Sequence, residues 1–133
     1  MSEQKETIFL TTKTAHLIEV CRKLKLSEDK EMNAGIFLKY MLIGISSRQT
    51  FVLVAPKDDS PDKINGYAVI TIMNNLENNH IWIDSMWTDG MDIEFMTVIE
   101  DFARTLDITK IHAKTKKNLK GFKELYRVVE KLL

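Results

Sequence analysis

The stretch HIWIDSMWTDGMDIEFMTVIEDFARTLDITKIHAK, residues 80–114, decides the fold. Its first part, His80–Trp87, is short, apolar and rich in aromatic and β-branched residues, which favours a strand. From Asp92 onward, apolar residues recur at helical spacing with acidic residues between them, which predicts a helix to about Asp107. The following segment, Lys110–Lys114, is a short strand candidate. A strand that returns after one helix is expected to lie parallel to the first through a right-handed crossover.

Side chains of the strand His80–Trp87 are expected to alternate between the two faces of a sheet. This alternation places Asp84 on a face with large apolar neighbours. The two predicted sets are Ile81, Ile83, Ser85 and Trp87 on one face, and Trp82, Asp84 and Met86 on the other.

Two further strands are predicted upstream. Phe51–Val54 and Gly66–Met73 are apolar and β-branched, and the segment Pro56–Pro61 between them carries a strong turn signal. Asn74–Asn79 reads as a second hairpin turn, which leads into His80. Three consecutive strands joined in this way predict an antiparallel meander.

Helices are predicted at both ends of the chain. A first helix is expected through Leu24, with Thr14 as its cap, and its apolar face is formed by Leu17, Ile18, Cys21 and Leu24. A second helix is expected to start at Ser27 and to run to about Ile45, unless Gly35 and Gly44 break it. Its apolar part, GIFLKYMLIGI, predicts burial.

The last element is predicted as a helix that starts near Asn118, and a strand from Glu124 is the competing interpretation. Its apolar positions are Phe122, Leu125, Val129, Leu132 and Leu133.

The length of 133 residues fits one domain, residues 1–133, and 44% hydrophobic with 29% charged residues is the composition of a globular protein. The single Cys21 and the polar start MSEQKE predict a reducing, cytoplasmic setting. No apolar run reaches the ~20 residues of a bilayer span, so no membrane association is expected. The histidines show no metal-ligand spacing, and no metal is predicted.

Net charge is zero, but acidic residues concentrate in residues 77–107 and basic residues in residues 110–131. A basic C-terminal segment indicates possible binding to phosphates or nucleic acid. A solvated helix face that is balanced by the acidic segment is the favoured interpretation.

The order of these elements resembles the GNAT superfamily of acyl-coenzyme A dependent N-acyltransferases, in particular small divergent members from bacterial viruses. Three stretches carry the resemblance: HIWIDSMW, the helix IEFMTVIEDFARTLD followed by ITKIHAKT, and NLKGFKELY. The resemblance covers roughly residues 10–130. It implies an α/β (α+β) fold with N-terminal helices, the meander, a crossover helix to a parallel strand, and a C-terminal helix. The family's last two strands are missing from this pattern, so either the fold is truncated or the last element is a strand.

The resemblance also implies that an acyl thioester lies beside a splayed central strand and that its pyrophosphate rests on amides at the start of the following helix. Family members usually have a Gly-rich loop with an Arg or Gln there. This chain has Thr88, Asp89, Gly90, Met91 and Asp92 instead. Only Gly90 matches, and two carboxylates replace the rest, so the pyrophosphate loop is degraded and acetyl-coenzyme A is a doubtful cofactor.

Within this resemblance, backbone amides of Met86, Trp87 and Thr88 are candidates to stabilise an oxyanion. Asp84 is the candidate base that takes the proton of the amine, and its alternative is a structural carboxylate bonded to a backbone amide. Tyr126 is the candidate acid that returns a proton to the thiolate, or else a core residue.

Asn118 marks the family's Asn or caps the last helix. Two functions follow. One is a divergent N-acyltransferase, and the other is a non-catalytic module that binds a protein or nucleic acid through the basic C-terminal segment. A homodimer is a further expectation, because a shortened sheet leaves an edge for a second copy and residues 35–45 offer an apolar surface.

Overall fold

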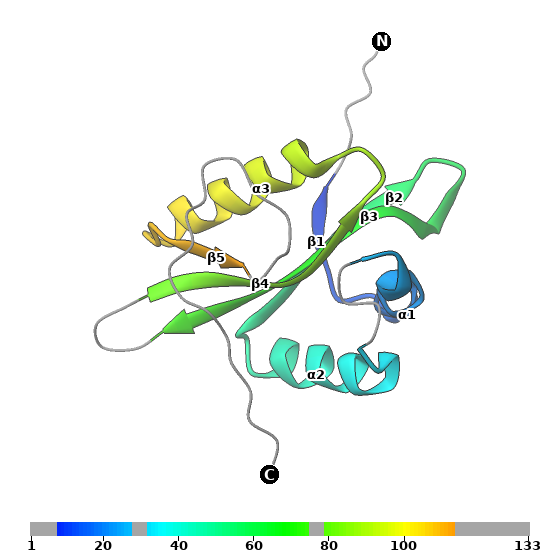
Figure 1. Ribbon diagram of the computed structural model, residues 1–133, viewed down its shortest axis with the longest axis horizontal. Helices are drawn as coiled ribbons and strands as arrows, with labels where there is room; N and C mark the ends of the chain where they lie inside the picture. The colour runs from blue at the N-terminus through cyan, green and yellow to red at the C-terminus, as the bar shows by residue number, and fades with distance from the viewer. Residues whose placement is uncertain (1–7, 28–31, 75–78, 114–133) are drawn as a thin grey trace.

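A mixed five-stranded sheet with helices on both faces is seen in the computed structural model, which describes residues 8–27, 32–74 and 79–113 (Figure 1). The elements in chain order are β1 (Phe9–Thr11), α1 (Thr14–Lys23), the 3₁₀ turn η1 (Leu24–Leu26), α2 (Ala34–Ser46), β2 (Thr50–Lys57), β3 (Ser60–Asn74), β4 (Asn79–Thr88), α3 (Asp92–Thr105) and β5 (Ile111–Ala113). The predicted α/β fold class is confirmed. The predicted final element, with Asn118 and Tyr126, lies outside the described residues.

The strand order is β1-β2-β3-β4-β5. Strands β1 to β4 pair antiparallel, and β5 pairs parallel to β4 after the chain has passed through α3. The meander and the crossover were predicted from the sequence. The short first strand β1 was not predicted, because the segment was read as a polar start.

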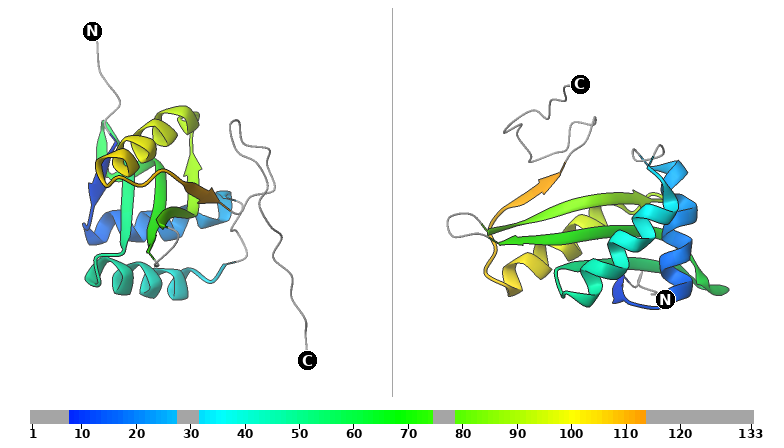
Figure 2. Two further views of the ribbon diagram at one scale, coloured as in Figure 1. Left: turned by 90° about the vertical axis from the view of Figure 1, so that its left-hand side faces the viewer. Right: turned by 90° about the horizontal axis from the view of Figure 1, so that it is seen from below.

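Two cores cover the two faces of the sheet. Helix α3 packs on one face, and helices α1 and α2 pack on the other (Figure 2). On the α3 side, Phe95 and Ile99 are fully buried against Ile81 of β4. On the other side, Leu17, Met41 and Tyr67 form the centre of the core.

A β-bulge in β4 corrects the predicted faces of that strand. Val69 pairs with Ser85 and Ile70 pairs with Ile83, so Asp84 is the additional residue. Because the alternation shifts there, Ser85 lies on the face of α1 and α2, where its hydroxyl bonds the buried Tyr67 at 2.9 Å. The prediction that Ser85 and Trp87 share a face with Ile81 and Ile83 was therefore wrong.

The predicted apolar face of helix α1 is confirmed for Leu17, Cys21 and Leu24, which pack in the core, but the cap and the place of Ile18 differ. Lys13 is its N-cap residue and makes no side-chain capping bond, so Thr14 does not cap the helix. The buried side chains are His16, Leu17, Glu19 and Val20. Ile18 is exposed, because the helix turns the side that carries His16, Leu17 and Val20 toward the sheet.

Helix α2 begins later than the sequence indicated. Ser27 closes η1 by bonding Leu24, and the cap of α2 is Asn33, whose side chain accepts a hydrogen bond from the Ile36 amide at 2.9 Å. Neither glycine breaks the helix. Gly44 permits close packing instead, since a Cβ there would overlap the Thr50 side chain of β2.

The apolar segment of α2 is not a buried helix. Phe37 and Met41 are buried, but Ile36 is 67% exposed and Ile43 is 61% exposed. The predicted burial was wrong because only one stripe of a largely apolar helix can face the sheet, and no other described element covers its outer side. Among the described residues, no helix has both the length and the apolar character to cross a membrane.

Three polar contacts fasten α1 to the start of β3. The His16 ring donates from Nε2 to the Pro61 carbonyl at 2.9 Å, and Lys13 pairs with Asp62 at 2.7 Å. The third contact is an ion pair of 3.6 Å between Glu19 and Lys63.

Candidate functional site

Asp84, at the bulge of β4, is held by hydroxyl groups from two other elements. The Thr71 hydroxyl of β3 donates to Asp84 Oδ2 at 2.5 Å, and the Tyr40 hydroxyl of α2 donates to Oδ1 at 3.1 Å. Thr71 is nearly buried and Asp84 is half-buried. The carboxylate is therefore fixed in position on the α1 and α2 side of the sheet.

A third hydroxyl extends this network into the core. Thr50 Oγ1 lies 3.1 Å from Thr71 Oγ1, and Thr50 is only 3% exposed. Because a hydroxyl has one proton and Thr71 gives its proton to Asp84, Thr71 accepts the bond from Thr50. The chain of donors thus runs from Thr50 through Thr71 to the carboxylate of Asp84.

Tyr40 remains a proton donor in this arrangement. Burial raises the pKa of its phenol, and the neighbouring charge of Asp84 raises it further. The neutral hydroxyl is therefore the form that faces Asp84 at neutral pH.

The strand residues after Asp84 lie beyond the part of β4 that pairs with β5. The parallel pairs of the described residues are Ile81 with Ile111, Trp82 with His112, and Ile83 with Ala113. We call these three pairs the β4–β5 seam. Figure 2 shows β5 set at an angle to β4, and β5 ends with the seam at Ala113.

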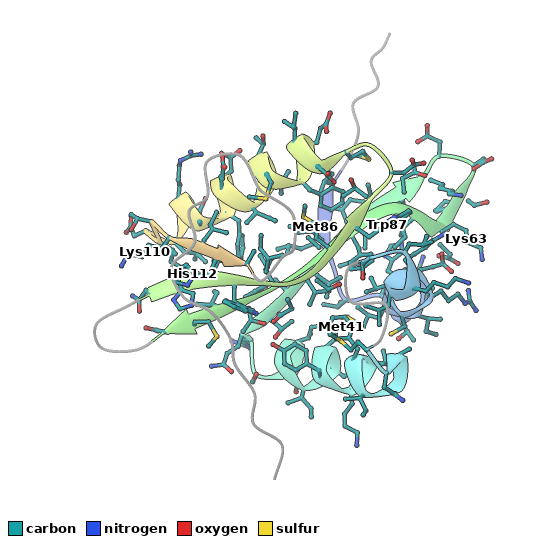
Figure 3. All side chains as sticks on the ribbon, viewed as in Figure 1. Met41, Lys63, Met86, Trp87, Lys110 and His112 are labelled. Atoms are coloured by element: carbon teal, nitrogen blue, oxygen red, sulfur yellow. The ribbon has the colours of Figure 1, made fainter. Side chains whose placement is uncertain are left out.

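Met86 and Trp87 follow the seam on β4 and point to opposite sides of the sheet. Met86 packs against the core on the α3 side of the sheet, and Trp87 packs against the core on the α1 and α2 side (Figure 3). The Lys23 ammonium lies 5.4 Å from the centre of the Trp87 ring, which is cation–π distance.

The loop from Thr88 to the start of α3 is closed by its own side chains. The Thr88 hydroxyl accepts a bond from the Met91 amide at 3.0 Å and donates to Asp92 Oδ1 at 2.5 Å. Gly90 has a φ of 78°, in the region that favours glycine, and its Cα faces open space.

The carboxylates of this loop disfavour a pyrophosphate. A helix start binds anions through free amides and partial positive charge. Here the Met91 amide is already bonded, and Asp92 and Glu94 place carboxylates in the first turn. Gly90 still provides the backbone approach, so the misfit lies in the charge.

The structure brings the candidate residues into two groups. Asp84 belongs to the hydroxyl network, whereas Thr88 and Gly90 belong to the loop before α3. Sequence reasoning missed Tyr40 and Thr71, which lie 44 and 13 residues from Asp84. Among the described residues, no three His, Cys, Asp or Glu side chains gather where they could hold a metal ion.

The five-stranded sheet with its crossover helix is the fold of GNAT acetyltransferases, and solved structures show the likeness. Aminoglycoside 6'-N-acetyltransferase AAC(6')-Ih from Acinetobacter baumannii aligns with a TM-score of 0.69 at 14% identity, over 93% of this chain and 95% of that one. A GNAT family acetyltransferase from Staphylococcus aureus aligns with a TM-score of 0.66 at 17% identity, over 96% and 98%.

AAC(6')-Iy, solved in complex with the bisubstrate analogue CoA-S-monomethyl-acetylneamine, aligns with a TM-score of 0.64 at 11% identity, over 92% of this chain and 94% of that one. The sequence matches no model of a protein family and no curated protein. At these identities the likeness defines the fold.

Proposed function

We propose that this chain is a divergent N-acyltransferase that moves an acyl group, such as acetyl, from coenzyme A to an amine. The observation that carries the proposal is the carboxylate of Asp84, which two hydroxyls hold at the bulge of β4 on a GNAT fold. The solved acetyltransferases with this fold, one of them bound to a coenzyme A analogue, support the class of reaction.

Asp84 is the proposed base in this reaction. An amine that attacks a thioester must lose a proton, and a positioned carboxylate contributes by accepting it. Tyr40 and Thr71 keep the carboxylate oriented, since each occupies one of its oxygens. Most of the remaining acceleration would come from holding the reactants in line.

The other proposed roles remain those given by the family resemblance. The amides of Met86, Trp87 and Thr88 are proposed to stabilise the oxyanion, and coenzyme A supplies the activated acyl group when bound. Tyr126 as acid and Asn118 as a cofactor contact stay proposals for residues outside the described part. A cytoplasmic setting and the likeness to members from bacterial viruses belong to the same proposal.

Coenzyme A is proposed to bind weakly because the loop before α3 is degraded. We expect a dissociation constant of about 0.1–1 mM for acetyl-coenzyme A, which corresponds to about −5.5 to −4 kcal/mol. Isothermal titration calorimetry with acetyl-coenzyme A and with coenzyme A tests this directly. An absence of binding heat at millimolar ligand would overturn the proposed cofactor.

A matched pair of variants shows where the ligand binds. Asp92→Asn removes a carboxylate at the start of α3, and Asp101→Asn makes the same change in the last part of that helix. Tighter binding in the first variant and unchanged binding in the second would place the pyrophosphate at the loop.

A second candidate is a non-catalytic module that binds a protein or nucleic acid. The Asp92 carboxylate, held by Thr88 at the start of α3, favours it, because it opposes a phosphate group there. The basic residues of positions 110–131, which are proposed to make the contact, lie almost wholly outside the described part. For nucleic acid, binding should weaken steeply with salt, and salt-independent or absent binding would remove that version.

We also propose that the protein forms a homodimer through α2. Ile36 and Ile43 are more than half exposed, and such apolar surface on one helix face is typical of an interface. Light scattering coupled to size exclusion should give twice the monomer mass, and Ile43→Lys should return it to the monomer mass. A monomer at high concentration would contradict this proposal.

A further inference from the structure

His80 and His112 stack on each other across strands β4 and β5. Their ring centres lie 3.9 Å apart with 23° between the ring planes, and Trp82 meets the His112 ring edge-on at 6.4 Å. His112 is the register partner of Trp82, so all three side chains lie on one face of the sheet. Figure 3 shows His112 with its neighbour Lys110 at the β5 end of the molecule.

The seam that this stack spans is short. Besides the three register pairs, the Ile81 amide donates to the Lys110 carbonyl at 3.0 Å. Ile111 and Ala113 pack against the α3 core but are only partly buried. Because few backbone bonds join the two strands within the described residues, side-chain contacts across the seam carry a large share of the pairing energy there.

The surroundings of the stack disfavour positive charge. Among the described residues, the charges that act on His80 are those of His112 and Lys110, both on the β5 side. The residue paired with His80 on β3 is the uncharged Met73. Two protonated rings at this separation would repel each other and Lys110.

Hydrogen bonding also disfavours the protonated form of His80. His80 Nδ1 is buried and has no hydrogen-bond partner among the described residues. Protonation would place an N–H at Nδ1 without an acceptor. A buried donor without an acceptor costs the free energy of its desolvation.

We propose that the His80–His112 stack makes the β4–β5 seam a pH-sensitive joint, closed when both rings are neutral and opened when the pair takes up protons. The joint is a property of the strands and does not depend on the proposed acyl transfer. Since the candidate site lies directly beyond the seam on β4, acid would loosen the wall beside it.

The direction of the pKa shift agrees with this proposal. Burial, then His112, then Lys110 lower the pKa of His80 from its ordinary value of 6.5. A base with a lowered folded pKa stabilises the closed state above the pKa of the open state. That stability is lost as the pH falls from about 6.5 through the lowered pKa of His80.

Two measurements on the wild-type protein test the joint. An NMR titration of the imidazoles should place the pKa of His80 below its ordinary value of 6.5. Hydrogen exchange of the Ile81 amide, which donates across the seam to the Lys110 carbonyl, should rise up to about tenfold per pH unit below about pH 6.5 after correction for intrinsic rates.

Val52 and Val69, in the central strands, are the internal control and should keep their protection. His80→Phe keeps a ring in the stack and removes the buried Nδ1, so it should abolish the acid-induced rise in exchange. His112→Phe removes the second imidazole and should reduce the rise without abolishing it. The proposal is overturned if the pKa of His80 lies at its ordinary value, if the Ile81 amide keeps its protection in acid, or if the full rise persists in His80→Phe.

Discussion

Asp84 and Asp92 each accept a hydrogen bond of 2.5 Å from a threonine hydroxyl, but the threonines come from different distances along the chain. The partner of Asp84 is Thr71 on the neighbouring strand, and Tyr40 of α2 adds a second bond. The partner of Asp92 is Thr88, four residues away in the same loop. The same chemical bond therefore fixes one carboxylate in a three-element site and merely closes a turn for the other.

This difference separates a positioned group from a local cap. A half-buried carboxylate with partners from α2 and β3 keeps its orientation only while the fold is intact. An exposed one at a helix start is screened by solvent, and its effects should be small. Four substitutions test the contrast, and they are ordered here by expected effect.

Asp84→Asn should have the largest effect. If Asp84 is the base, kcat of acyl transfer should fall about 100-fold or more while KM changes little. A coupled assay of free thiol release measures it, with Asp101→Asn as the control for loss of one carboxylate. Full activity in Asp84→Asn would leave Asp84 a structural residue.

Gly44→Ala disturbs the hydroxyl network at Thr50. The new Cβ would overlap Thr50, so we expect a loss of unfolding free energy of about 1–3 kcal/mol. That cost outweighs the gain of about 0.5–1 kcal/mol that Ala has over Gly in a helix. Urea denaturation measures it. Gly35→Ala in the same helix is the control and should not destabilise, because its Cβ would meet only Asn33 Oδ1, at 3.3 Å, while the helix gains about 0.5–1 kcal/mol.

Tyr40→Phe removes one of the two hydroxyls from Asp84. Tyr40 is partly exposed, so its loss should cost about 1 kcal/mol of stability. If Tyr40 is a positioning residue, kcat should fall several-fold and its pH profile should shift, whereas a purely structural role would leave the profile unchanged.

Asp92→Asn should have the smallest effect, and of opposite sign. Removing this charge should tighten coenzyme A binding about two- to fivefold, equivalent to about 0.3–1 kcal/mol. Calorimetry detects such a change at several salt concentrations, and it should shrink as salt rises. A weaker affinity in the variant would mean that Asp92 helps the ligand.

Local pattern was sufficient to predict much of this fold. The spacing of Phe95, Ile99 and Ala103 gave α3, and the apolar runs gave the three central strands and the parallel crossover. The bulge in β4 could not be read in this way. A bulge adds one residue without any change of composition, so strict alternation misplaced Ser85 and Trp87.

Only part of the candidate site could be predicted, because local sequence pattern does not show contacts between distant residues. Asp84 stood out as a carboxylate among apolar residues, and the acidic loop before α3 was visible in the sequence. Tyr40 gave no signal, since its contact with Asp84 spans 44 residues and depends on how α2 crosses the sheet. The start of α2 was misplaced because Ser27 and Asn33 are equally good caps.

The contacts between α1 and the start of β3 hold the tip of the β2–β3 hairpin in a fixed position relative to α1. The turn at Asp58 and Asp59 is exposed, and the contacts from Lys13, His16 and Glu19 reach the chain only two to four residues later. A fluorophore or short peptide inserted in that turn should therefore disturb little. It would also keep a defined direction relative to α1, as an orientation reporter for the whole molecule requires.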